Sequence, residues 1–179
     1  GVIAARLLTD RLSPTSDILM ARIVHSGKND SNQGKNRRDG FCYYLKEVGF
    51  SGKLHEVELK ISDSVYNFAK LNEIFELNPG IKGAIIFNST CYILGNYLKT
   101  RGMQAVKLVG YDLIERNTQL LSEGVITALI AQRPERQGYE GIKSLCNYLL
   151  FKQKSEKVNL MPIDILLREN LKYYLNNKL

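Results

Sequence analysis

The chain has 179 residues, of which 44% are hydrophobic and 24% charged, and its net charge is +7. This length suits one domain with a real core or two small lobes. No stretch approaches the ~20 consecutive apolar residues of a membrane span, so no membrane partner is expected. The lysines and arginines are scattered and do not alternate with aromatic residues. Solvated helix faces therefore explain the charge better than nucleic-acid binding does.

The first third of the chain alternates between helical and strand patterns. The predicted elements are helices over 1–12, 36–48 and 65–77 and strands over 18–24 and 54–61. The second strand alternates in polarity, as expected near a sheet edge. A polar loop is predicted over 26–34. Because the chain begins in a helical pattern without methionine, we expect it to be a piece of a longer protein.

The centre of the sequence predicts a β-α-β unit. Residues 84–87 and 106–109 are short apolar runs without alternation, which is typical of parallel strands buried on both faces. Residues 92–98 between them have helical spacing. The two strands end at Asn88 and Asp112, and ligands of open α/β sheets bind beyond the carboxyl ends of the strands.

The rest of the chain continues the alternation. Helices are predicted over 113–122 and 134–150 and strands over 125–130 and 158–167. Pro162 within the last strand indicates an edge or a bend. The tail over 170–179 is expected to fray. The whole pattern predicts a doubly wound α/β fold with a mostly parallel sheet.

Several polar residues fall at predicted strand ends or helix starts that face one edge of this sheet. They are Gln33, Arg37, Ser62, Asp63, Asn88, Ser89, Asp112 and Gln132. Each alone could be a helix cap or an ordinary surface residue. Together, a carboxylate, a guanidinium and an amide can hold a polyol through charge-assisted hydrogen bonds.

Enzyme and metal signatures are missing from the sequence. It has no glycine-rich phosphate loop and no Gly-x-Ser-x-Gly turn, and its two histidines stand alone. The three cysteines are widely spaced and indicate reduced core residues of a cytoplasmic protein. Asp112 could be a nucleophile, but nothing nearby would activate it. Binding without catalysis, and without a cofactor or metal, is therefore predicted.

Four segments occur in the order and spacing of a known family. They are Asn-Arg-Arg-Asp-Gly-Phe at 36–41, Ile-Phe-Asn-Ser at 86–89, Val-Gly-Tyr-Asp at 109–112 and Ile-Ala-Gln-Arg-Pro at 130–134. The chain thereby resembles lactose-repressor-type transcription regulators, whose effector domain shares the type I fold of periplasmic sugar-binding proteins. The resemblance implies that the ligand-binding residues are Arg37, Asn88, Asp112, Gln132 and Gln33. The family's Asn-Asp pair is Asn88-Ser89 here, so one carboxylate is lost.

The resemblance also implies a domain organisation. Residues 1–179 would be the carboxyl-terminal portion of an effector-binding domain. Residues 16–130 and about 158–179 would form its C-terminal lobe, and helices within 1–15 and 131–152 would belong to the N-terminal lobe.

The implied partners are a small-molecule effector, a second copy of the protein, and operator DNA. The effector would be a sugar, and the DNA would bind an upstream helix-turn-helix outside this sequence. The dimer contact would lie on two helices, through Tyr92, Ile93, Tyr97, Leu120 and Leu121, unless these five are core residues. A periplasmic sugar-binding protein is the alternative, and an enzyme acting on sugar phosphates is a second one.

Overall fold

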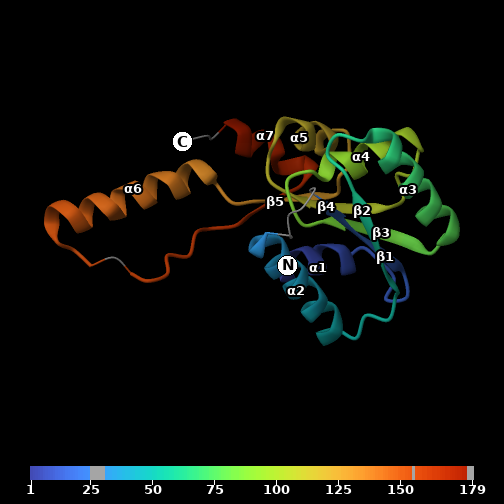
Figure 1. The fold of residues 1–179 in the computed structure, drawn as a ribbon, viewed down its shortest axis with the longest axis horizontal. Coiled ribbons are helices and arrows are strands. Elements are labelled where there is room, and N and C mark those ends of the chain that lie inside the picture. Colours follow the sequence, from blue (N-terminus) through green and yellow to red (C-terminus); the bar gives the residue numbers. More distant parts are fainter. Residues whose placement is uncertain (25–30, 155, 177–179) are drawn as a thin grey trace.

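The computed structural model describes residues 1–24, 31–154 and 156–176, and a six-stranded sheet lies at its centre (Figure 1). The predicted loop over 26–34 falls largely outside these residues. The strands are β1 Asp17–Ile23, β2 Leu54–Leu59, β3 Ile81–Ile86, β4 Lys107–Tyr111, β5 Ala128–Ala131 and β6 Asp164–Leu166. The helices are α1 Val2–Thr9, α2 Asn32–Glu47, α3 Ser64–Leu77, α4 Cys91–Thr100, α5 Glu115–Ser122, α6 Pro134–Phe151 and α7 Arg168–Asn176.

The sheet order is β2-β1-β3-β4-β5-β6. Strands β1 to β5 are parallel, and β6 pairs with β5 in the antiparallel direction. The predicted mostly parallel, doubly wound fold is therefore confirmed, and β2 lies at an edge as its alternating sequence indicated. In the described part of the chain, no helix has the length and apolar character that crossing a membrane needs.

Helices cover both faces of the sheet, because the central strands are apolar on both sides. Residues of α1 and α2 pack on one face around Met20 and Ile85. Residues of α3, α4, α5 and α7 pack on the other face around Leu19 and Leu108. Residues of β1, β3, β4 and β5 thus enter two separate cores, as the period of a strand requires.

Three departures from the sequence prediction have a clear physical cause or a large extent. Helix α2 begins at Asn32, one turn early, because the Ser31 side chain accepts the Gly34 N–H and caps it. The predicted strand over 158–167 is reduced to Asp164–Leu166. The tail forms α7, because Leu171 is buried against the core and Asn170 binds backbone groups at the end of β6.

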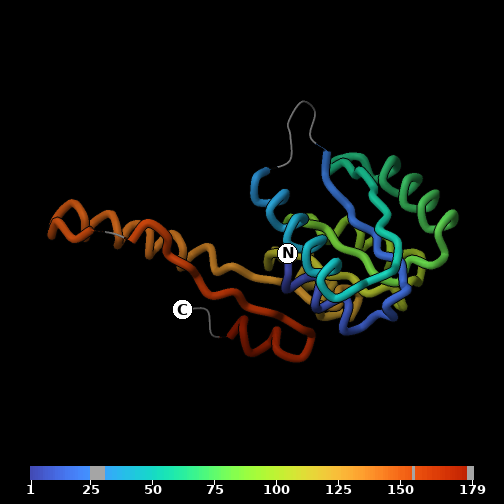
Figure 2. The backbone as a smooth tube through the Cα atoms, turned by 90° about the horizontal axis from the view of Figure 1, so that it is seen from below, coloured from blue at the N-terminus to red at the C-terminus, as the bar shows by residue number. Residues whose placement is uncertain are grey.

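Helices α1 and α6 behave differently from each other. In α1, Ala4, Ala5 and Leu8 are fully buried against α2 and this sheet. The assignment of residues 1–15 to the N-terminal lobe stays a prediction. Helix α6 has no buried residue. It projects from the body of the molecule, and the chain returns beside it to β6 (Figures 1 and 2).

The residues predicted for a dimer contact are mostly interior. Tyr97, Leu120 and Leu121 are at most 4% exposed within the single chain, so the core alternative is correct for these three. Tyr92 and Ile93 are partly buried and remain on the surface of α4.

Gly110 gives a direct test of packing in the core beneath the sheet's carboxyl edge. A Cβ at this position would lie 2.3 Å from Cys91 Sγ. We expect Gly110→Ala to lower the free energy of unfolding by ~1–3 kcal/mol through overpacking. Urea denaturation measures this loss. Gly138→Ala is the control, because a Cβ there meets open space; equal losses for the two variants would contradict the packing argument.

Candidate functional site

The candidate ligand site lies at the carboxyl edge of the parallel strands. Asn88 follows β3, Asp112 follows β4, and Gln132 follows β5. Gln33 and Arg37 reach this edge from the first turns of α2. Parallel strands end at the same edge, so the fold brings residues far apart in sequence to one side of the sheet. All five ligand-binding residues that the family resemblance implies therefore come from elements at this edge.

Arg37 is the centre of the site. Its side chain is buried, with the residue only 8% exposed. Nη1 donates to the backbone oxygen of Phe87 at 2.8 Å, and the guanidinium carbon lies 4.0 Å from the centroid of the Tyr111 ring. Burial lowers the pKa of Arg37 and the Asp112 charge opposes that shift. An arginine remains charged in such a place, so a positive charge is fixed beneath the surface of the site.

Two buried polar atoms at the site lack a partner among the described residues. They are Nη2 of Arg37 and the hydroxyl of Tyr111. Burial also raises the pKa of Tyr111 to about 12, so its hydroxyl is a neutral donor at physiological pH. Leaving a buried donor unpaired costs ~1–3 kcal/mol, and such atoms in a native protein call for a bound water or ligand.

Asp112 adopts an unusual backbone conformation at the end of β4. Its φ is +65°, which aspartate tolerates better than most residues, and its N–H donates to Ile130 O at 2.9 Å. Burial raises the pKa of its carboxyl, and Arg37 acts in the opposite direction. The carboxyl is thus held by its backbone close to the Arg37 charge.

The Asn88 side chain organises its own loop. Its Oδ1 accepts the Thr90 backbone N–H at 3.0 Å and the Thr90 hydroxyl at 2.5 Å. This oxygen is therefore used within the loop that leads into α4, and the amide nitrogen of Asn88 is the group that can donate to a ligand.

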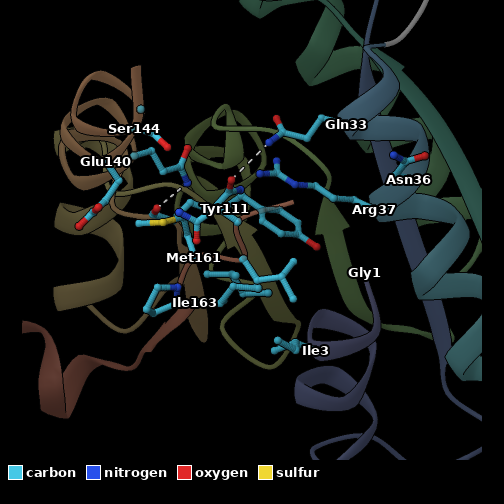
Figure 3. A pocket seen from close by; sticks show the side chains of 17 residues that line it. Gly1, Ile3, Gln33, Asn36, Arg37, Tyr111, Glu140, Ser144, Met161 and Ile163 are labelled. Carbon is cyan, nitrogen blue, oxygen red and sulfur yellow. Dashed lines mark hydrogen bonds between the residues drawn. The ribbon is translucent and has the colours of Figure 1, made fainter. Parts of the chain in front are cut away.

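Gln33 and Gln132 meet across the edge of the sheet. Gln33 Nε2 donates to Gln132 Oε1 at 3.3 Å, and the Gln132 backbone oxygen accepts from Gln137 Nε2 at 2.7 Å (Figure 3). These contacts tie the start of α2 to the segment that leads from β5 into α6.

A cleft of about 860 Å³ opens beside these residues. Gln33, Arg37, Tyr111 and Gln132 line it from the sheet edge, while α6 and residues 159–163 line it from the other side (Figure 3). Asn88 and Asp112 do not line this cleft. The structure thus brings three predicted residues into the cleft, places Asp112 next to Arg37, and leaves Asn88 in the neighbouring loop. Tyr111 is a lining residue that the sequence reading missed, because it belongs to a buried apolar strand.

No group of three or more metal-ligating side chains gathers within the described ranges. The donors at the cleft are instead guanidinium, phenol and amide groups. These groups suit a neutral or weakly charged ligand rich in hydroxyls.

An ion pair links the end of β5 to the start of β6. Arg133 Nε and Nη2 donate to the Asp164 carboxylate at 2.6 and 2.7 Å. These bonds hold the pKa of Asp164 below its usual value. Because the folded-state pKa is depressed, the stabilisation is present above the unfolded-state pKa of ~3.9 and disappears as the pH falls through the folded-state value.

We therefore expect Asp164→Asn to lower the melting temperature at pH 7 by roughly 2 °C, a small shift because the pair is partly exposed. The melting temperatures of the variant and the parent should converge on acidification. Thermal denaturation from pH 7 downward measures this. Asp10→Asn is the control, since Asp10 is exposed and lies 3.9 Å from Arg6; a pH-independent difference for Asp164→Asn would contradict the assignment.

Residues 1–153 match the periplasmic binding protein domain family, and the chain belongs to that family. The structure is similar to that of a "putative LacI transcriptional regulator" from Bacteroides fragilis, with a TM-score of 0.89 and 39% sequence identity over 97% of this chain and 60% of that chain. The resemblance stated from the four sequence segments is thereby confirmed. No curated protein matches the chain.

Two solute-binding proteins of transporters share the fold. One, from Agrobacterium vitis, is bound with α-D-tagatopyranose and has a TM-score of 0.77 and 20% identity over 94% of this chain and 55% of that chain. The other, from Agrobacterium radiobacter, is in complex with D-arabinose and has a TM-score of 0.76 and 22% identity over 94% and 58%. This chain spans less than two thirds of each of these three proteins.

Proposed function

We propose that this chain is the effector-sensing part of a LacI-type bacterial transcription regulator and that its effector is a sugar or a similar small polar metabolite. The observation that carries the proposal is a pair of buried donors at the carboxyl edge of the parallel strands, Arg37 Nη2 and Tyr111 OH, which have no partner within the described part of the chain. Ligand hydroxyls supply the acceptors that these donors lack. The sugars bound by the two transporter proteins support this class of ligand.

The proposed contacts follow from the chemistry of each side chain. Arg37 donates to ligand oxygens, Asp112 accepts from a pair of ligand hydroxyls, and the amide groups of Asn88, Gln33 and Gln132 complete the site. No residue acts as a nucleophile or a base in this proposal, so the protein binds and does not catalyse. No cofactor is required.

The proposed mechanism couples lobe closure to operator DNA through a cytoplasmic homodimer. A ligand held between the sheet edge and an opposing lobe binds the closed state better and shifts the population toward it. The dimer contact would use α4 and α5, where Tyr92 and Ile93 are only partly buried and Arg116 lies 4.9 Å from the Tyr92 ring. A DNA-binding head upstream of this chain would read the operator.

The experiment is a thermal-shift screen of a complete regulator containing this chain, followed by calorimetry. The panel contains D-ribose, D-arabinose, D-xylose, D-allose, D-tagatose, D-glucose, D-galactose and their phosphates. We expect one saccharide to bind at micromolar concentration without turnover and to change operator binding. Turnover of a sugar phosphate would favour the enzyme alternative. A saccharide that binds without any effect on DNA would favour a transport-type binding protein.

A further inference from the structure

Asn117 in α5 is the most completely buried polar side chain among the described residues, at 0% exposure. Its Nδ2 group donates to the backbone oxygens of Ser89 at 2.8 Å, Tyr111 at 3.1 Å and Asp112 at 3.1 Å. Its Oδ1 accepts the backbone N–H of Tyr92 at 2.9 Å. One side chain therefore satisfies backbone groups from the ends of two neighbouring strands and from the start of a helix.

These four backbone groups lie where regular pairing stops. Ser89 follows the candidate ligand residue Asn88, and Tyr111 and Asp112 are the residues that carry the phenol and the carboxyl of the site. Backbone groups that leave a strand have lost their ladder partners and cannot be buried without replacements. Asn117 supplies the replacements, and it also fixes the distance between the two loops.

We propose that Asn117 is a positioning residue for ligand binding, which holds the β3 and β4 loops in the one arrangement that presents Asn88, Tyr111 and Asp112 together. This inference rests on the proposed function, because its effect on ligand affinity requires that a ligand contact these two loops. The positive φ of Asp112 strengthens the argument, because a residue in that conformation needs its surroundings to hold it there. Asn117 does not touch the ligand; it acts through the backbone.

The chain contains a matched control for this role. Asn67 in α3 is 5% exposed, and its side-chain amide also hydrogen-bonds backbone groups outside its own helix. Its Oδ1 accepts the Lys60 N–H at 2.8 Å and its Nδ2 donates to Lys60 O at 2.6 Å. Neither Lys60 nor Asn67 lines the cleft. Removing either asparagine takes away the side-chain partner of these backbone groups, so both changes weaken the fold, but only one acts on the candidate site.

The first measurement is amide hydrogen exchange on the full chain, comparing Asn117→Ala with Asn67→Ala. After correction for the change in global stability, we expect exchange in residues 88–92 and 111–113 to rise at least ~10-fold in Asn117→Ala. In Asn67→Ala the rise should be confined to residues 60–67. Uniform loss of protection in Asn117→Ala, with no excess in the two loops, would overturn the proposal.

The second measurement is the affinity of a complete regulator for the saccharide that binds best in the panel above. We expect Asn117→Asp, which keeps the side-chain shape and the Tyr92 contact but loses the donors, to weaken binding at least ~10-fold. Asn67→Ala should change the affinity by less than ~2-fold. Equal effects of the two variants would overturn the positioning role. If no saccharide binds the parent protein, the proposed function fails, and the exchange experiment still decides whether Asn117 holds the two loops.

Discussion

Replacement of Asp112 by asparagine is expected to lower the saccharide affinity of a complete regulator by at least ~100-fold while leaving it folded. Each hydrogen bond to a charged group contributes ~1.5–3 kcal/mol, and the loss of two such bonds gives a change of this size. Asparagine tolerates the positive φ at this position and keeps the N–H bond to Ile130 O. The substitution therefore removes charge and leaves the backbone in place.

The change is also expected to have a small cost in stability. Arg37 is buried and loses the Asp112 charge that opposes the effect of burial on its pKa. We expect a loss of ~1 kcal/mol or less in the free energy of unfolding. Calorimetry and urea denaturation measure the two effects separately. Asp39→Asn is the matched control, because Asp39 lies on α2 two residues from Arg37 but is exposed. Undiminished affinity in Asp112→Asn would remove Asp112 from the site.

The sequence could place the candidate site at the carboxyl edge of the sheet because strand ends can be recognised locally. The apolar runs that became β3 and β4 are short and unbroken, and the parallel arrangement follows from the helices between them. Asn88 and Asp112 could thus be assigned to one edge without a structure. Arg37 could be placed near this edge from its position at a helix start, but nothing in the α2 sequence shows that this arginine, beside Arg38, turns inward and is buried.

Other features depend on tertiary contacts that have no local signal. Tyr111 looks like one more apolar strand residue, and only the packing of Arg37 on its ring shows its role. Asn117 looks like a polar residue on a solvated helix, yet it is fully buried and binds backbone groups up to 28 residues away. The same limitation explains α1. Its helical spacing is visible in the sequence, but periodicity does not reveal which sheet covers an apolar helix face.

Helix α6 has an apolar face that nothing in the described structure covers. Ile142, Leu145 and Leu149 are 67%, 57% and 54% exposed, although their spacing gives one apolar face. Exposed aromatic residues, Tyr139, Tyr148 and Phe151, extend the apolar surface of the same helix. Burying apolar surface contributes ~25 cal/mol per Å². A helix with an apolar face therefore gains most of its stability from packing against another part of the protein. We propose that the cover is the opposing lobe of a complete regulator, in keeping with the 60% of the Bacteroides fragilis chain that this chain spans.

The 179-residue chain alone is therefore expected to bind the panel's best saccharide at least ~100-fold more weakly than a complete regulator does. The cleft is lined from one side by the sheet edge and from the other by α6, and an uncovered α6 cannot hold that second wall in place. A ligand with one wall stays hydrated and makes half of its hydrogen bonds. Calorimetry on both proteins measures the ratio.

One substitution tests, in both proteins, whether the apolar face of α6 is covered by an opposing lobe. Leu145→Gln should change the free energy of unfolding of the 179-residue chain by less than ~0.5 kcal/mol, because Leu145 is exposed there. In a complete regulator the same change should cost ~2 kcal/mol or more, since it places a polar amide in an apolar interface. Leu94→Gln is the control and should destabilise both proteins, because Leu94 lies in the core of this lobe. Micromolar saccharide binding by the monomeric 179-residue chain would show that its cleft needs no second lobe, and the proposed division of the binding site would then be wrong.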